Sequence, residues 1–148
     1  MNLPFLLALL ALTGSCARPL ATSSAEVRYL GPSEPGTTHV QARGCASGSG
    51  PEAVTRQAAK NAFETLFFRG IPGSEVSTPL VADEAAARRQ HATYWQEFYE
   101  QGRYRTFLVA QAEVSPRVRQ CASFDLTINH AALRKDLEQH GVVRAFGY

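Results

Sequence analysis

The first sixteen residues decide which part of this chain can fold. An uncharged apolar run from Leu3 to Leu12 is followed by small residues and then by Cys16. A run of about ten apolar residues suits the core of an export signal and is well short of the roughly twenty needed to span a bilayer. We therefore expect residues 1–15 to be removed and Cys16 to become an acylated N-terminus. An ordinary secretory peptide with an incidental Cys16, or an uncleaved anchor, are the alternatives.

The residues around Cys16 also indicate a destination. Two or three acyl chains attach a protein durably, whereas a single chain holds it only marginally. Ala17 stands where bacterial lipoproteins retained in the inner membrane commonly carry Asp, so the chain resembles lipoproteins sorted to the outer membrane. We expect the mature protein to be anchored there and to face the periplasm. Residues 16–26 are mostly small and polar and predict a flexible tether.

Residues 27–148 are long enough for one domain with its own hydrophobic core. The net charge of +2 is too small to indicate a nucleic-acid partner. No repeat divides this region. We expect a single domain, and the sequence leaves its self-association into a homo-oligomer open.

Two segments alternate clearly between apolar and polar side chains. Residues 37–46 place Val40 and Ala42 on one side of a strand, and residues 121–129 do the same with Phe124 and Leu126. Between them, a helix that starts near Pro51 carries alanines and phenylalanines on one stripe and ends at Gly70. The alanines predict a close approach of this helix to a sheet.

The whole pattern predicts an α+β fold, a small mixed β-sheet with helices packed on one face. The strand after the helical crossover should run parallel to the first strand, and the next should return antiparallel through a hairpin. Expected elements are strands at 27–30, 37–46, 103–112 and 121–129, helices at 51–69, 83–101 and 130–140, and a C-terminal tail that docks as a short strand.

Cys45 and Cys121 remain once Cys16 carries lipid. Alternation puts both on the outward faces of their strands, Cys45 at the end of one and Cys121 at the start of another. If the strands are antiparallel neighbours, the sulfurs lie at the same edge, and an oxidising compartment favours a disulfide. Unpaired thiols, or a reactive thiol near His39 or His130, are the alternatives.

No residue pattern identifies a catalytic centre, a metal site or a cofactor. The four histidines lack metal-ligand spacing, and there is no CxxC. Gly-Ser-Gly at 48–50 could cradle an anion before a helix, but a plain turn explains it as well. We expect no metal and no cofactor.

The loop between the two longest predicted helices is unusually apolar. Buried, its apolar side chains would cap the end of the core. Exposed, they would form a docking patch for another protein, with an arginine as a directional contact. The candidate contact residues are Arg69, Ile71, Pro72, Leu80 and Val81.

The strand His39-Val-Gln-Ala-Arg-Gly44 and the alanine-rich helix that begins at Glu52 carry a family resemblance. The chain is similar to small flagellar outer-membrane lipoproteins and to the N-terminal domain of flagellar assembly protein T. This resemblance implies a compact sheet-and-helix fold, no cofactor and a role in assembly or scaffolding. The apolar loop and the Cys45/Cys121 pair depart from that pattern.

We therefore expect a periplasm-facing outer-membrane lipoprotein without catalytic activity, which assists assembly through contacts with an envelope protein. A small-ligand-binding module is the first alternative and would need a concave pocket lined by Tyr94, Tyr99 and Tyr104. A thiol-dependent envelope enzyme is the second and would need Cys45 or Cys121 to be free.

Overall fold

The computed structural model describes residues 27–32, 34–47 and 50–145. The predicted signal (1–15), the lipidation site Cys16 and the tether (16–26) lie outside the described residues. In chain order the elements are β1 (Val27–Gly31), β2 (Thr37–Cys45), α1 (Pro51–Phe68), α2 (Glu84–Gln90), α3 (Ala92–Tyr99), the 3₁₀ helix η2 (Arg103–Phe107), β3 (Leu108–Glu113), β4 (Cys121–Asn129) and α4 (His130–Gln139).

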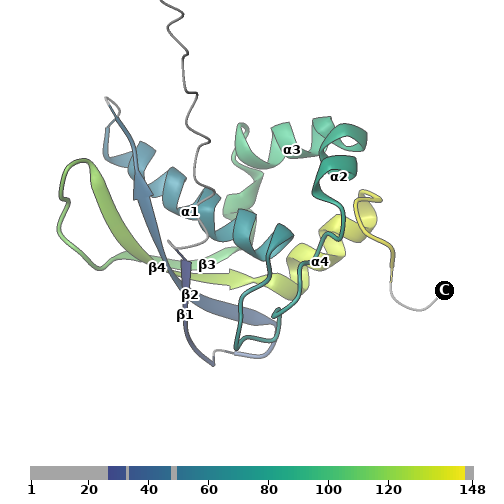
Figure 1. The fold of residues 1–148 in the computed structure, drawn as a ribbon, viewed down its shortest axis with the longest axis horizontal. Helices are drawn as coiled ribbons and strands as arrows, with labels where there is room; N and C mark the ends of the chain where they lie inside the picture. The colour runs from purple at the N-terminus through teal and green to yellow at the C-terminus, as the bar shows by residue number, and fades with distance from the viewer. Residues whose placement is uncertain (1–26, 33, 48–49, 146–148) are drawn as a thin grey trace, which may run out of the picture.

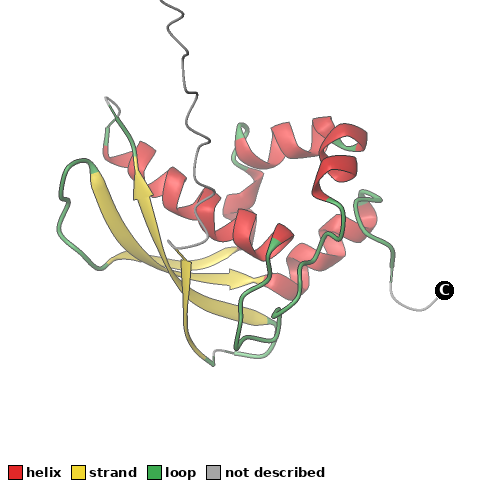
Figure 2. Ribbon diagram, viewed as in Figure 1, coloured by secondary structure: helices red, strands yellow, loops and turns green. Residues whose placement is uncertain are grey.

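The four strands form one sheet in the order β1-β2-β4-β3, and every neighbouring pair is antiparallel. The helices lie on one side of this sheet and at its end (Figure 1, Figure 2). The α+β prediction is confirmed, but the prediction of a mixed sheet is wrong. The two strands joined by the helical crossover, β2 and β3, do run in the same direction. They do not pair, because β4 lies between them and is antiparallel to both.

Helix α1 packs on the face of the sheet that the alternation predicted to be buried. Four apolar side chains of this face are fully buried: Val40 and Ala42 of β2, and Leu126 and Ile128 of β4. The helix comes very close to β2 at Gly44, where a Cβ atom would lie 2.1 Å from the carbonyl oxygen of Val54. Only glycine fits there, which explains the glycine at the second-to-last position of β2.

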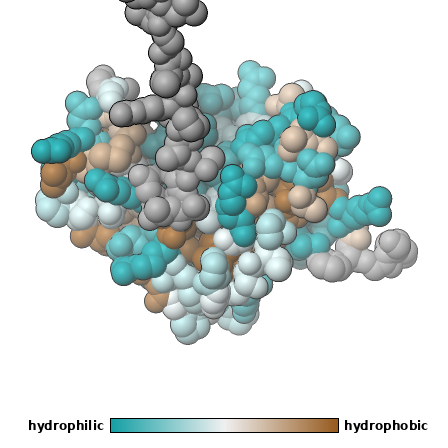
Figure 3. Space-filling model, viewed as in Figure 1, coloured by the Kyte–Doolittle hydropathy of each residue, from teal (hydrophilic) through white to brown (hydrophobic). Residues whose placement is uncertain are grey.

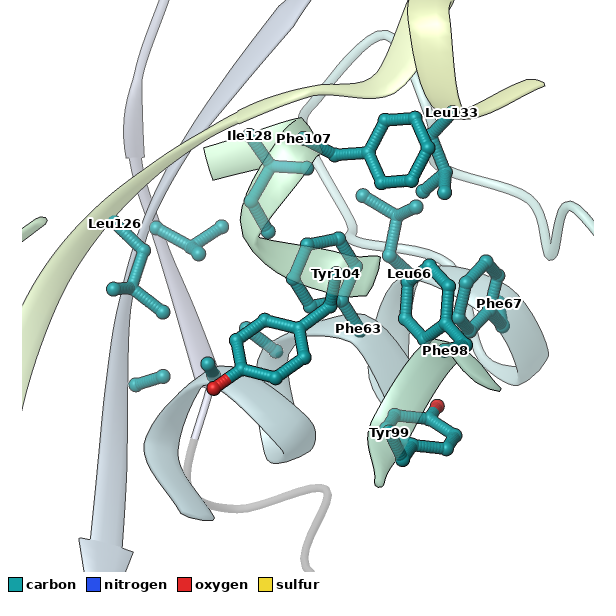
Figure 4. Close-up of a cluster of buried hydrophobic side chains, with 14 of the residues drawn as sticks. Phe63, Leu66, Phe67, Phe98, Tyr99, Tyr104, Phe107, Leu126, Ile128 and Leu133 are labelled. Carbon is teal, nitrogen blue, oxygen red and sulfur yellow. The ribbon is translucent and has the colours of Figure 1, made fainter. Parts of the chain in front are cut away.

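Aromatic side chains fill the space between α1, α3 and η2. The rings of Phe63 and Phe98 meet edge to face with their centroids 5.2 Å apart, and Phe67 packs against Phe98 at 5.1 Å. Figure 4 shows these three rings beside Leu66, with Tyr104 and the sheet residues Leu126 and Ile128 around them. Edge-to-face geometry is the favourable arrangement for such rings. This cluster is the core that the phenylalanines of the predicted helix supply.

The predicted helix over 83–101 is two helices. His91 leaves the helical conformation (φ −120°, ψ 37°) and separates α2 from α3. The indole N–H of Trp95 donates to the carbonyl oxygen of Ala87 at 3.0 Å across this break. The bend lets the aromatic face of α3 turn onto α1, so Tyr94, Trp95 and Phe98 are buried as the periodicity predicted.

Helix α4 is tied to α3 and η2 through a buried carboxylate. Asp136 accepts a hydrogen bond from the Tyr94 hydroxyl at 2.9 Å and forms an ion pair with Arg103. Burial alone would raise the pKa of Asp136, but the hydrogen bonds from Arg103 and Tyr94 outweigh it and hold that pKa below its usual value. The carboxylate is therefore charged and fully used in holding the helices together.

The tail after α4, which is described as far as Ala145, does not form the short strand that we predicted. Val142 and Val143 instead fold back on the helix, with the amide of Val142 donating to the carbonyl oxygen of Leu137 at 2.9 Å. Both valines are partly buried against the core. No helix among the described residues has the length and apolarity needed to cross a bilayer.

Candidate docking groove

The apolar loop after α1 mainly caps the core. Ile71 is 2% exposed, so its side chain is not accessible to a partner and it is corrected as a candidate contact. Val81 is 4% exposed and contributes only to the lining of the groove described below. Arg69 and Pro72 are exposed, and Leu80 is partly buried. The loop could cap the core or form a docking patch, and Ile71 and Val81 cap the core. Only the loop margins remain open to solvent.

The loop folds this way because the chain turns sharply at Gly70. This residue has φ +75°, and a Cβ atom there would lie 2.4 Å from the carbonyl oxygen of Ser77. The turn returns the chain to the end of α1, where the amide of Val81 donates to the carbonyl oxygen of Phe67 at 2.9 Å. The backbone amide of Ile71 donates to the carbonyl oxygen of Val76 at 2.8 Å, and this hydrogen bond closes the loop on itself.

A groove of about 370 Å³ begins where the loop leaves the core. Its walls are the end of the loop, helix α2 and the segment after α4. Its lining combines apolar side chains with polar residues of both charges in about equal measure. Figure 3 shows apolar surface between α2 and α4. The groove is lined by Leu80, Val81, Ala82, Asp83, Ala86, Ala87, Gln90, His91, Arg134, Val142, Val143 and Arg144.

Local contacts fix the walls of the groove. Asp83 caps α2, and its carboxylate accepts a hydrogen bond from the amide of Ala86 at 2.8 Å. Arg134 donates to Glu138 at 3.1 Å along α4. The rim therefore offers polar groups held in place by the fold, above a floor that contains Leu80 and Val143.

Sequence reasoning found Leu80 and Val81 but missed the other walls of the groove. His91 is half-buried and lines the hollow. The pair Val142-Val143 directly after Gly141 was a usable signal, because two valines beyond a helix stop have to pack somewhere. The bend at His91, which aims α2 at the groove, had no signal in the periodicity.

The two remaining cysteines are bonded. Cys45 and Cys121 are directly opposite in the register of β2 and β4, with their Cα atoms 4.1 Å apart and a bond between the sulfurs. This confirms the predicted disulfide and the neighbouring, antiparallel strands it depended on. The thiol-enzyme alternative required one of these sulfurs to be free, and the bond uses both.

One side-chain arrangement resembles a nucleophilic site. Thr38 Oγ1 lies 2.8 Å from His130 Nδ1, and His130 Nε2 lies 3.3 Å from a carboxylate oxygen of Glu75. Thr38 is only 1% exposed, so no substrate reaches its hydroxyl. Burial lowers the pKa of His130, and the charge of Glu75 opposes that shift. The three residues instead connect the apolar loop to β2 and to the start of α4.

The tyrosine pocket of the small-ligand alternative is only partly formed. Tyr94 is 5% exposed and donates its hydroxyl proton to Asp136, so it lines no open pocket with the other two. Tyr99 and Tyr104 border a polar hollow of about 150 Å³, which also contains Lys60. Sites for drug-sized ligands usually measure about 300–1,000 Å³. The groove beside α2 is therefore the better candidate for recognition.

The described part of the chain contains no group of three or more His, Cys, Asp or Glu side chains arranged to hold a metal ion. No protein-family model, curated protein or solved structure matches the chain. The resemblance to flagellar lipoproteins therefore stays a prediction from the sequence.

Proposed function

We propose that this chain is a lipoprotein of the outer membrane that faces the periplasm and acts without catalysis, as an assembly or accessory factor. It binds an apolar segment of an envelope protein in the groove between the loop end, α2 and residues 142–144. The acyl chains on Cys16 provide the anchor, and residues 17–26 give the domain reach from the membrane.

The groove is the single observation that carries this proposal. Its floor combines Leu80, Ala86 and Val143, and its rim carries Asp83 and Arg144. An apolar segment that enters such a hollow loses contact with water, which stabilises the complex by about 25 cal/mol for each Å² of apolar surface buried. Polar groups around an apolar centre are the usual arrangement of a recognition surface.

Two further observations support a role outside the cytoplasm. A disulfide that bridges β2 and β4 is typical of proteins that fold in an oxidising compartment. The sequence before Ala17 has the order of apolar run, small residues and cysteine that lipoprotein signals have. Both fit a domain that is exported and then anchored.

The anchor is tested by the intact mass of the protein purified from Gram-negative membranes, with and without a reductant. We expect loss of residues 1–15, an added acyl mass and, on reduction, the gain of two hydrogens. A soluble product without acyl mass would overturn the anchored assignment. An unchanged mass on reduction would overturn the disulfide.

The groove is tested by placing a photo-crosslinking amino acid at Ala86 or Val143 and irradiating intact cells. We expect both positions to capture the same envelope protein. Gln139, exposed on α4 and not part of the groove lining, is the matched control position and should not capture it. In a second variant, Leu80→Asp should reduce capture from Ala86. Capture that is equal from Gln139, or that survives Leu80→Asp unchanged, would contradict docking in the groove.

A further inference from the structure

The exposed large hydrophobic side chains of the described residues all belong to one hairpin. They are Val109 (61% exposed), Val114 (45%) and Val118 (60%), on or beside β3. Figure 3 shows apolar surface at the end of the molecule where this hairpin lies. Single exposed valines are ordinary, but a group on one element indicates a contact surface.

Strand β3 is also an edge of the sheet. Among the described residues it pairs with β4 on one side and has no strand on the other. All residues from Val109 to Glu113 are exposed, so no helix or loop of the described chain covers this edge. An uncovered edge presents backbone N–H and C=O groups that a further strand can use.

The ladder with β4 shows which residues direct their backbone groups outward. The amide of Val114 donates to the carbonyl oxygen of Ser123 at 2.9 Å, so Val114 directs its backbone groups toward β4. Because these directions alternate along a strand, Ala112 also faces β4, whereas Gln111 and Glu113 offer their N–H and C=O groups to the free edge.

The side chains of β3 divide between the two faces of the sheet. Gln111 and Glu113 are opposite Leu126 and Phe124 and therefore lie on the side of the helices. Ala112, opposite Asp125, lies on the bare face, as do Ala110 and Val114, two positions to either side. The free edge thus has an apolar side and a polar side.

We propose that a second copy of this chain adds its own β3 to this edge, antiparallel and about a two-fold axis at Ala112. In this register Ala112 is opposite Ala112 of the second copy, and Ala110 is opposite Val114. Gln111 is then opposite Glu113. The Glu113 carboxylate already accepts from Arg117 of its own chain, and each of its oxygens has a second lone pair that can accept from the Gln111 amide of the other copy. The sheets of the two copies become one continuous antiparallel sheet.

This register satisfies the backbone and the side chains together. Gln111 and Glu113 supply the outward N–H and C=O groups, so the pairs between them exchange the inter-strand hydrogen bonds. Ala112 forms the closer pair without hydrogen bonds, where a small side chain fits best. Moving the axis to Gln111 would instead place each Glu113 opposite Val109, so the carboxylate would keep only its own Arg117 and gain no donor from the second copy. A two-fold axis is the commonest symmetry of protein oligomers.

Oligomeric state is the first test, measured by sedimentation on the full-length chain with Cys16→Ser over a wide range of concentration. We expect reversible dimers. Gln111→Pro removes an outward N–H and no bond to β4, so it should weaken dimerisation by about tenfold or more while the monomer stays folded. Ala112→Lys places like charges together and should do the same. Gln139→Lys adds the same charge on exposed α4 and should leave the dimer unchanged.

Crosslinking tests the register. In the same Cys16→Ser chain, Ala112→Cys should form dimers linked by a disulfide, because the closer pairs bring Cβ atoms together. Val118→Cys offers a similarly exposed thiol outside β3 and should form far fewer. A chain that is monomeric at every concentration would overturn the proposal, and so would dimers that persist in both Gln111→Pro and Ala112→Lys. If the Ala112→Cys chain forms disulfides only with a different protein, the edge binds a strand of that protein and the dimer proposal is overturned.

Discussion

Two apolar segments of this protein have opposite outcomes. The loop over residues 69–82 contains prolines and glycines, and its apolar side chains could have been on the surface. The structure buries Ile71 at 2% exposure and Val81 at 4%. In residues 107–109 (Phe-Leu-Val), Phe107 is buried and Leu108 is partly buried, yet Val109 is 61% exposed. Strand β3 thus leaves the core at Val109, although its composition resembles that of a central strand.

The difference teaches that position in the layers decides burial. The loop crosses the open end of the layer between α1 and α3, where an apolar side chain is needed to exclude water. Strand β3 lies at the edge of the sheet, where its residues beyond Leu108 pass outside the helices. The loop is consequently held by buried surface, whereas the β3–β4 hairpin is held near its turn by a covalent bond at Cys121.

Removing the disulfide that holds the β3–β4 hairpin should have the largest effect on the free energy of unfolding. Replacing Cys45 and Cys121 together by alanine should lower the free energy of unfolding by about 4.5 kcal/mol, the value that chain entropy gives for a closed loop of this length. The measurement is urea unfolding of the variant beside the parent without reductant. A loss of less than about 1 kcal/mol would mean that buried contacts hold the hairpin as well as the loop.

A smaller effect is expected on the buried side. Ile71→Ala leaves a cavity under the loop and should cost about 3 kcal/mol of the free energy of unfolding, near the middle of the range for truncating a buried aliphatic side chain. Val109→Ala is the matched control, an apolar truncation at an exposed position, and should cost about 0.5 kcal/mol or less. Equal losses in urea unfolding would remove the contrast between the two segments.

Acid should loosen the loop before it affects the rest of the fold. His130 connects the loop to β2, and burial lowers its pKa below the usual 6.5 while Glu75 opposes the shift. The folded protein therefore takes up this proton less readily than the unfolded chain. The contribution is complete above pH 6.5 and is lost as the pH falls through the lower, folded pKa.

Two measurements check this acid sensitivity. The NMR signal of the His130 ring should titrate with a midpoint below 6.5, and a midpoint at or above that value would contradict the assignment. His130→Asn should flatten the dependence of the urea midpoint on pH in this range. Asp136, whose pKa is held below 3.8, affects stability only at still lower pH, so the two groups are separable.

The smallest effect is expected at Arg69. Its ion pair with Glu84 is 3.3 Å long, and the Arg69 side chain is 47% exposed. Exposed pairs of this kind contribute about 0–1 kcal/mol. Arg69→Ala should therefore leave the urea midpoint almost unchanged. A large loss of stability would show that the loop margin is as structural as Ile71.

Much of the fold could be predicted from the sequence because its strongest signals are local. The alternation in residues 121–129 and the alanine stripe of α1 gave the right elements, the right buried face and the right cysteine pair. The position of β4 between β2 and β3 depends on pairing across long distances, for which the alternation holds no signal; only the Cys45/Cys121 pair indicated that β4 lies beside β2. The bend at His91 depends on how Trp95 meets Ala87 in three dimensions. The groove could not be predicted for the same reason, since its walls come from three separated segments.

The pairing of β2 with β4 also sets when the domain can form. The disulfide joins positions 76 residues apart, and the contact between Thr38 and His130 spans 92. Proteins dominated by contacts this distant fold slowly, because a long loop must close before any stabilising contact forms. The two central strands cannot meet until nearly the whole chain has been synthesised. A chain that stays open for that time is easier to pass through a narrow export channel than one that folds early.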